Sequence, residues 1–331
     1  MDLVTERVTL AIYIGVDGGG TLTRAVAVDE TGRVVGVASA GGSNPEHTPH
    51  AERNAREAVL SVVRAVGCEL RDVAGLVAGF AGLDHADDQV WAEQQTAVPG
   101  LDCPRLHVND AVVAHAGALE SRPGIIAISG TGSIVLGVTE SGRHIRNYDF
   151  RHYAPSGAAT LALDAIHRVL IGEDKPADAE FVRRILAFWN KPGVPALRAA
   201  ASKGFIADAA ARNYRFGAMA SVVTQAAQDG SPLAQSVCDK AAQALTVGIR
   251  LMARCFQGKS VEVALIGGAV RSIYMQGAVA AALPLDPGRR FVITDPAFSP
   301  EIGAAAMALT RGGIPLTGAI LHNLHTVAAP A

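Results

Sequence analysis

Two glycine-rich loops with hydroxyl side chains are the segments of this sequence best suited to phosphate chemistry. The first reads DGGGTLT, residues 17–23, and the second reads GTGS, residues 130–133. A polyphosphate is bound by backbone N–H groups that approach without side-chain bulk, which is why glycine suits such loops. Taken alone, either loop also fits an ordinary hairpin turn closed by glycines. The residues that we expect to contact phosphate are Gly18, Gly19, Gly20, Thr21 and Thr23 in the first loop and Gly130, Thr131 and Gly132 in the second.

Two aspartates have positions that suit phosphoryl transfer. Asp17 directly precedes the first glycine loop, where a carboxylate can hold a hydrated Mg²⁺ that the phosphates also bind. Asp110 ends the strand-like segment LHVND, and at the carboxyl end of a strand it can accept the proton of an attacking hydroxyl. The competing interpretation is that Asn109 and Asp110 cap the helix that follows, and both roles are compatible. Asp84 is interpreted as part of a solvated loop.

An internal repeat indicates how these loops are positioned. Residues 12–35 and 125–145 each read as an apolar strand, a Gly-rich turn, a second strand and a tight turn into a third. The separation from Thr21 to Gly32 is 11 positions, and so is that from Thr131 to Gly142. This pattern predicts two copies of a three-strand meander, each with a glycine turn after its first strand.

The remaining segments predict an α/β fold with mixed sheets covered by helices. Residues 8–16 read as the first strand, and the segments 261–270 and 291–296 as later strands. We place the small N-terminal domain at residues 1–119, with about 312–331 returning to it, and the larger domain at residues 120–311. Apolar or Ala-rich stretches at helical spacing predict helices over residues 49–66, 158–170, 177–189, 196–210, 217–255 and 300–309.

Composition excludes several classes of protein. The 331 residues carry a formal net charge of −2 with no basic cluster, so nucleic acid is not an expected partner. No apolar run is long enough to cross a bilayer, and we expect a cytoplasmic protein. The four cysteines form no CxxC pair, which favours reduced thiols over a zinc site or a disulfide framework.

Six sequence blocks, in order between Ile14 and Leu309, carry a resemblance to a known family. They read IGVDGGGTLTRAVAVD, GFAGLD, VNDAVVAHAGAL, GIIAISGTGS, LIGGAV and SPEIGAAAMAL. The chain resembles the N-acetylglucosamine kinase and BadF/BadG/BcrA/BcrD ATPase family of the actin, sugar-kinase and Hsp70 superfamily. The resemblance implies two duplicated, ribonuclease H-like (actin-like ATPase) domains with ATP and Mg²⁺ in the cleft between them.

The resemblance also implies a role for individual positions. Asp17 would be the Mg²⁺-associated carboxylate, and Asp110 would be the catalytic base. Gly19, Gly20 and Thr21 would hold the β- and γ-phosphates, and Thr131 and Gly132 would form the second phosphate loop. Gly267 and Gly268 would lie against the adenosine, and Asn44 would contact the sugar. The residues expected at the substrate are Asn44, Asn109, Asp149, Arg151 and His152.

One segment departs from the family pattern. The sugar kinases carry a Gly-Trp-Gly type turn and an acidic GDEGS-like motif, where this chain reads RNYDFRHYAPSGAAT, residues 146–160. The cations Arg146 and Arg151 in this segment suit an acceptor that carries a carboxylate or phosphate, because guanidinium groups pair with such anions in a bidentate way. The alternative is a solvated loop with the sugar site completed elsewhere.

Three functions remain open at this point. The first is an ATP-dependent kinase that transfers the γ-phosphate to a hydroxyl of a sugar or sugar-like molecule, with altered recognition of that acceptor. The second is an ATPase activator of a CoA-ester reductase or dehydratase. The third is a nucleotide-binding protein without transfer activity. The expected partners are a small-molecule acceptor and, as a candidate, a second copy of the chain in a homodimer.

Overall fold

The computed structural model describes residues 11–285 and 288–326, and the chain divides into two compact units. The first unit contains the residues up to Arg122 and those from Pro296 onward, and the second runs from Pro123 to Asp295. The sequence-based boundary at 119/120 lies close to this division, but the return to the first unit begins well before residue 312. Residues 8–10 of the expected first strand lie outside the described residues, as do residues 327–331 of the expected return.

The early return follows from the packing of helix α10 (Pro300–Arg311) against strand β1 (Ile12–Gly18). A Cβ atom at Gly15 would lie 2.2 Å from the carbonyl oxygen of Glu301 and 2.3 Å from the amide nitrogen of Ala305. Only glycine permits this approach of helix and strand. The helix at 300–309 was predicted, but its assignment to the second domain was wrong.

The first unit is built on a five-stranded mixed sheet with the order β3-β2-β1-β4-β5. Strands β1, β2 (Leu22–Asp29) and β3 (Val34–Gly41) form the expected antiparallel meander. Strands β4 (Val73–Phe80) and β5 (Arg105–Asn109) continue the sheet parallel to β1. Gly18, Phe80 and Asn109 are paired in register, so β1, β4 and β5 end in one row.

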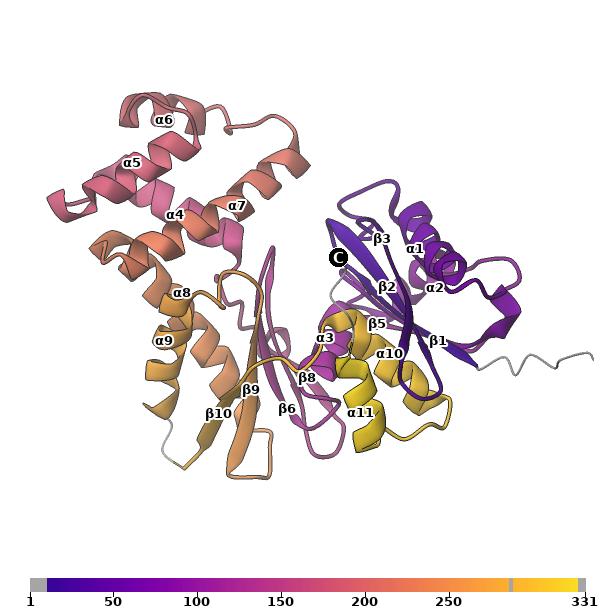
Figure 1. The fold of residues 1–331 in the computed structure, drawn as a ribbon. Helices are drawn as coiled ribbons and strands as arrows, with labels where there is room; N and C mark the ends of the chain where they lie inside the picture. The colour runs from indigo at the N-terminus through magenta and orange to yellow at the C-terminus, as the bar shows by residue number, and fades with distance from the viewer. Residues whose placement is uncertain (1–10, 286–287, 327–331) are drawn as a thin grey trace, which may run out of the picture. The chain divides into compact units, whose positions relative to one another are not determined.

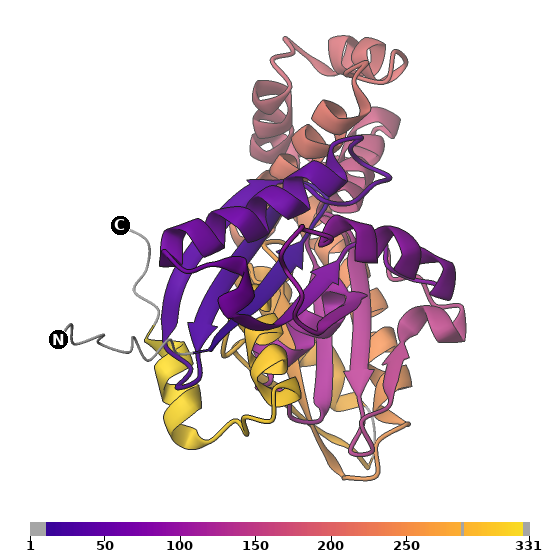
Figure 2. The ribbon, with the colours of Figure 1, turned by 90° about the vertical axis from the view of Figure 1, so that its right-hand side faces the viewer.

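Helices cover both faces of this first sheet (Figures 1 and 2). Alternate residues of β1 enter different cores: Ile14 and Val16 pack with helix α1 (Ala51–Val66), whereas Tyr13 packs with α10. This alternation is the period of two that a strand buried on both faces requires. The remaining helices of the unit are α2 (Gln89–Gln95), α3 (Asp110–Ala118) and α11 (Gly318–His325).

The second unit repeats the sheet topology, in the order β10-β9-β6-β7-β8. The meander consists of β6 (Gly124–Ser129), β7 (Ser133–Val138) and β8 (His144–Arg146), and β9 (Ser260–Ile266) and β10 (Arg290–Thr294) run parallel to β6. The predicted duplication of an α/β unit is therefore confirmed. The helices of this unit are α4 (Ala158–Ile171), α5 (Ala179–Phe188), α6 (Val194–Ala201), α7 (Ala209–Gln228), α8 (Pro232–Ala253) and α9 (Ile273–Ala282).

Helices α7 and α8 occupy the stretch that the sequence analysis assigned to one helix over residues 217–255. The break falls at Gly230, whose φ of 94° ends α7, and at Ser231, whose hydroxyl accepts a hydrogen bond from the Ala234 amide. Pro232 then occupies the first position of α8. Within the described ranges 11–285 and 288–326, no helix has the length and hydrophobicity needed to cross a membrane.

Candidate active site

Two carboxylates lie at the end of the row formed by β1, β4 and β5. Asp17 is the penultimate residue of β1, beside Gly79 of β4, and Asp110 follows the last residue of β5. Carboxyl ends of parallel strands are the usual place for ligands of α/β sheets. The fold of the first unit therefore brings the predicted metal-associated and catalytic aspartates to one edge of one sheet.

Asp17 carries excess negative charge in its surroundings. Burial and, to a smaller extent, the carboxylates of Asp110 and Glu301 raise the pKa of Asp17 to about 7. Arg24 opposes them only weakly: its guanidinium lies 3.7 Å from the Asp17 carboxylate and is half exposed, whereas the Asp17 side chain is 15% exposed. Glu301, from the first turn of α10, was not among the predicted site residues, because nothing in the sequence indicates that this helix returns to β1.

Asp110 is a partly buried carboxylate with another carboxylate nearby. Burial raises the pKa of Asp110 to about 6, against the lowering effect of the hydrogen bond from the Ala111 amide, and the nearby Asp84 carboxylate adds to the increase. The N-cap of α3 is Asn109, whose side chain accepts a hydrogen bond from the Ala111 amide at 2.9 Å. Capping is therefore mainly the task of Asn109, and Asp110 is the first helical residue.

Asn109 and Asp84 interact with each other at the start of α3. The side-chain amide of Asn109 also donates to Asp84, 3.3 Å away, so both polar groups of Asn109 have partners within the protein. Asn109 therefore supports the start of α3, and its role at the substrate stays a prediction. Asp84 is exposed in the loop after β4, as the sequence indicated, and its charge also acts on Asp110.

The first glycine loop divides its residues between packing and possible ligand contact. A Cβ at Gly18 would lie 2.3 Å from the Ser43 hydroxyl and 2.4 Å from the Phe80 ring, so glycine is required there by the protein itself. The Gly19 amide donates to the Leu22 carbonyl at 3.0 Å, within the turn. Gly20 is partly exposed and Thr21 fully so, and these two are the loop residues best placed for phosphate.

The side chains of Thr23 and Asn44 form hydrogen bonds within the protein. The buried Thr23 hydroxyl donates to the Gly41 carbonyl at 2.8 Å, so its predicted role as a phosphate donor is wrong. The buried Asn44 accepts from the Glu46 amide at 2.8 Å and thereby shapes the loop between β3 and α1. A Cβ at Gly20 would lie 2.5 Å from the His47 ring nitrogen, which places this loop against the first glycine loop. The role of Asn44 at the sugar stays a prediction.

The second glycine loop is open in a way that the first is not. Cβ atoms at Gly130 or Gly132 would meet no atom within 4 Å, so the chain's own packing does not require glycine at either position. Thr131 is exposed, and the Gly130 carbonyl accepts from the Ala158 amide at 2.8 Å, which places the first residue of α4 against the loop. Space and a nearby helix N-terminus suit a phosphate group.

The Gly-Gly turn after β9 lies beside this second loop. A Cβ at Gly267 would lie 2.3 Å from the Ser129 carbonyl, and its φ is 103°, so the protein's own backbone requires this glycine. The packing of the protein's own backbone therefore explains Gly267 without a contact to adenosine, which stays a prediction. Gly268 has open space around its Cβ position and stays a candidate for nucleotide contact.

The loop at 146–153 is more structured than a solvated loop. Asp149 accepts a hydrogen bond from the Arg146 amide at 2.9 Å, and the two side chains form an ion pair at 3.6 Å. The His152 ring packs against Gly248 of α8, and burial lowers its pKa. Asp149 and His152 thus have contacts within the protein, and their roles at the substrate stay predictions. Arg151 is exposed, with a left-handed φ of 56°, and forms no ion pair with the residues that the structure describes.

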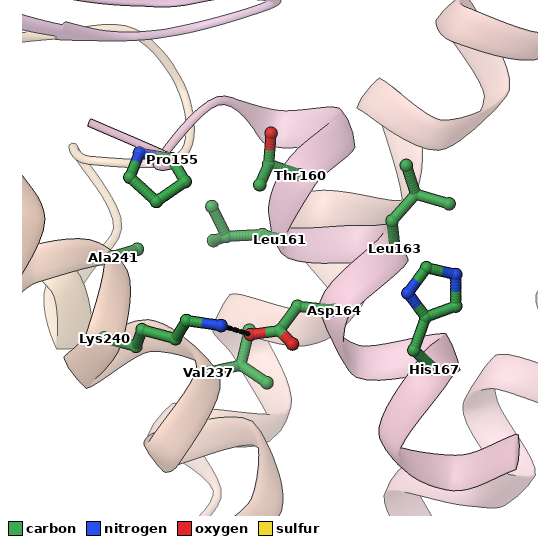
Figure 3. Close-up of a pocket in the computed structure, with 9 residues that line it drawn as sticks. All are labelled: Pro155, Thr160, Leu161, Leu163, Asp164, His167, Val237, Lys240 and Ala241. Atoms are coloured by element: carbon green, nitrogen blue, oxygen red, sulfur yellow. Dashed lines mark hydrogen bonds and ion pairs between the residues drawn. The ribbon is translucent and has the colours of Figure 1, made fainter. Parts of the chain in front are cut away.

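A cavity of about 270 Å³ lies between α4 and α8 in the second unit (Figure 3). Its apolar part includes Leu161 and Val237, and an ion pair between Asp164 and Lys240, 3.3 Å long, lies at its edge. None of the predicted site residues lines it. Because its charged groups are paired with one another, we assign it no chemistry.

The residues around Asp17 fit a hydrated divalent cation. Hard cations prefer carboxylate, phosphate and water oxygens, and Mg²⁺ usually keeps several waters. Asp17 and Asp110 supply carboxylates, and one side-chain oxygen of Glu301 is buried without a hydrogen-bond partner. No three His, Cys, Asp or Glu side chains among the described residues form a direct metal cluster. This donor set therefore fits a cation held largely through water and phosphate.

Comparisons with known structures agree with this fold. A candidate N-acetylglucosamine kinase from Chromobacterium violaceum has a similar structure, with a TM-score of 0.68 at 22% identity, covering 91% of this chain and 99% of that one. A ROK-family glucokinase from Streptomyces griseus, solved with glucose and AMPPNP, gives a TM-score of 0.59 at 17% identity, with 91% and 100% coverage. The fold is thus the two-domain α/β architecture of the actin-like ATPases and sugar kinases.

The sequence comparisons are more specific. Residues 14–152 match the model of the BadF/BadG/BcrA/BcrD ATPase family. An N-acetylmuramic acid/N-acetylglucosamine kinase from Clostridium acetobutylicum is 26% identical over 267 residues, which cover 78% of this chain and 86% of that protein. The family resemblance noted in the sequence is confirmed by these matches.

Proposed function

We propose that this protein is an ATP-dependent carbohydrate kinase that phosphorylates a hydroxyl of an amino sugar of the N-acetylglucosamine type. The observation that carries the proposal is the pair Asp17 and Asp110, two carboxylates at the ends of the parallel strands β1 and β5, on either side of β4. The charge of Asp110 acts on Asp17, and the first glycine loop that follows Asp17 has a partly exposed Gly20 and an exposed Thr21. Phosphoryl transfer needs little more from a protein than positioned carboxylates and phosphate donors. The names of the sequence relatives point to the same reaction.

Asp110 acts as the general base in this proposal. With a pKa raised to about 6, its carboxylate is ionised at neutral pH and yet has a pKa near the working pH, which is the best compromise for accepting a proton. Asp110 takes the proton of the acceptor hydroxyl while the hydroxyl oxygen attacks the γ-phosphorus of ATP, and ADP leaves. Asn109 holds the start of α3, so that the base has a fixed position.

Asp17 and the two glycine loops serve the nucleotide. When bound, Mg²⁺ would neutralise phosphate charge, and Asp17 would hold it with the help of water molecules. We propose that Gly20 and Thr21, from the first loop, and Gly130, Thr131 and Gly132, from the second, donate to phosphate oxygens, with Gly268 near the adenosine. Gly18 and Gly19 instead fix the shape of the first loop.

The acceptor is proposed to carry an anionic group. Arg151 is an exposed cation on a rigid turn without an ion-pair partner in the described part of the chain. A bidentate guanidinium–carboxylate contact is worth about 1.5–3 kcal/mol. The name of the relative from Clostridium acetobutylicum includes N-acetylmuramic acid, an amino sugar with a carboxylate. We therefore propose an acidic amino sugar as the preferred acceptor.

The test is acceptor-dependent ADP release with N-acetylmuramic acid, N-acetylglucosamine, glucosamine and glucose. We expect turnover with the amino sugars and a KM for the acidic acceptor that rises ten- to a hundredfold in Arg151→Ala, while the KM for N-acetylglucosamine changes little. The control Arg183→Ala removes an exposed arginine of α5 that is paired with Glu180 and should change neither value. No ADP release with any sugar would overturn the kinase proposal, and equal KM changes for both amino sugars would overturn the role of Arg151.

The other two functions are not favoured. The sequence relatives are named as sugar kinases, and nothing comparable points to a redox partner. The four cysteines are free thiols, and burial raises the pKa of Cys68, Cys103 and Cys238. Free thiols and the use of ATP support a cytoplasmic location, and we keep the homodimer as a proposal.

A further inference from the structure

Glu301 is a partly buried carboxylate without a role in the proposed reaction. It lies in the first turn of α10, and one of its side-chain oxygens is buried without a hydrogen-bond partner in the described structure. Its charge raises the pKa of Asp17, as does that of Asp110, and the Arg24 guanidinium acts against them. A buried carboxylate oxygen without a donor is costly unless a ligand supplies one.

The position of Glu301 is fixed more firmly than a surface residue would be. The Glu301 carbonyl oxygen lies so close to Gly15 that no larger residue fits there, and α10 is buried between β1 and α3. Gly15 is two residues before Asp17 in the same strand. The backbone contact therefore fixes the spacing between the segment of α10 that carries Glu301 and the strand that carries Asp17.

We propose that Glu301 is a positioning residue for the divalent cation at Asp17, whose unpaired oxygen accepts a hydrogen bond from a water of the hydrated cation. This inference rests on the proposed function, because that function brings the cation to Asp17. Partners of this outer kind usually alter metal affinity ten- to a hundredfold when removed. Glu301 would thus complete the donor set that Asp17 alone cannot supply.

The main competing account is that Glu301 simply stabilises α10. An acidic residue in the first turn interacts favourably with the helix dipole. This account does not explain why its oxygen is buried where its charge acts on Asp17, since an exposed position would stabilise the helix equally well. The two accounts also predict opposite effects on stability, since removing a helix-stabilising charge destabilises the protein and removing a repelling charge stabilises it.

The test compares Glu301→Gln with wild type at pH 8, where the neighbouring carboxylates are ionised. Manganese(II) binding in the presence of ADP, followed by electron paramagnetic resonance of the free ion, should weaken at least about tenfold in the variant. The thermal midpoint of the metal-free variant should rise, because one of three like charges is removed. Glu52→Gln is the matched control: Glu52 also lies in a first helical turn, is exposed and pairs with Arg56 at 2.7 Å.

The outcomes separate the two levels of the proposal. Unchanged manganese affinity, or a lower midpoint without metal, would overturn the role of Glu301 while leaving the kinase proposal intact. Wild-type protein that binds neither manganese nor ADP would overturn the proposed function together with this inference. Weaker manganese binding in Glu301→Gln, with Glu52→Gln unaffected, supports it.

Discussion

Each unit continues its fifth strand directly with an aspartate, Asp110 after β5 and Asp295 after β10, but the two carboxylates have different surroundings. Asp110 opens helix α3 beside Asp84 and acts on Asp17, and its pKa is raised to about 6. Asp295 is exposed and is followed by Pro296, where the chain leaves the second unit. A duplicated topology thus repeats the position of the residue without repeating its chemistry.

The two glycine loops also differ, in whether the protein's own packing requires their glycines. In the first unit, Gly18 is required by the packing of Phe80 and Ser43, so that the loop is fixed by its own protein. In the second unit, Gly130 and Gly132 have empty space where a side chain would be. The first unit therefore combines carboxylates with a glycine loop whose shape its own packing fixes. The second unit offers a glycine loop with open space, which a ligand can approach closely.

The largest effect is expected from Asp110→Asn. Loss of a general base typically lowers turnover about 100- to 10,000-fold, and the fold should be unaffected because Asn109 remains the cap of α3. The matched variant Asp295→Asn changes the residue at the equivalent position of the other unit and should leave turnover unchanged. Steady-state ADP release and thermal unfolding of both variants make the comparison. An equal loss in both, or an unfolded Asp110→Asn protein, would contradict it.

The glycine comparison predicts effects of different kinds. Gly18→Ala introduces a Cβ within 2.4 Å of Phe80 and Ser43 and should destabilise the protein by about 1–3 kcal/mol. Gly132→Ala meets no protein atom and should leave the thermal midpoint nearly unchanged. Its added methyl group would hold a phosphate away from the loop amides, and losing one such hydrogen bond to a charged phosphate should weaken nucleotide binding roughly tenfold. Calorimetric titration with ATP and thermal unfolding measure both. A stable Gly132→Ala protein with normal ATP affinity would remove the second loop from the nucleotide site.

Local patterns in the sequence were sufficient to predict much of this fold. The equal spacing of the two meanders predicted the duplicated sheets, and the polar ends of β1 and β5 predicted Asp17 and Asp110. Both inferences depend on neighbours along the chain, where periodicity and turn residues carry the information. The break between α7 and α8 was missed, although Gly230 and Pro232 are ordinary signals for the end and start of a helix.

The missed site residues depend on contacts between distant segments. Glu301 reaches Asp17 only because α10 packs on β1, a contact for which Gly15 is necessary but not distinctive in the sequence. Thr23 was expected at a phosphate because of its residue type, and its internal partner is the Gly41 carbonyl of β3, which no local pattern identifies. A hydroxyl group therefore cannot be assigned to a ligand until its protein partners are known.

The smallest expected effect concerns Asp84 and the pH dependence that Asp110 imposes. The base must be ionised, so kcat/KM should fall as pH decreases through the pKa of Asp110, which is about 6. Asp84 raises that pKa because a second negative charge disfavours ionisation of the first, so Asp84→Asn should move the acid limb toward lower pH. Asparagine can still accept the hydrogen bond from Asn109, which keeps the start of α3 in place. Asp87→Asn is the control, since Asp87 is exposed in the same loop and is not among the groups that shift the pKa of Asp110. The pH profiles of wild type and both variants decide the matter: an acid limb that stays in place in Asp84→Asn, or moves equally in Asp87→Asn, would show that Asp84 does not set the charge state of the base.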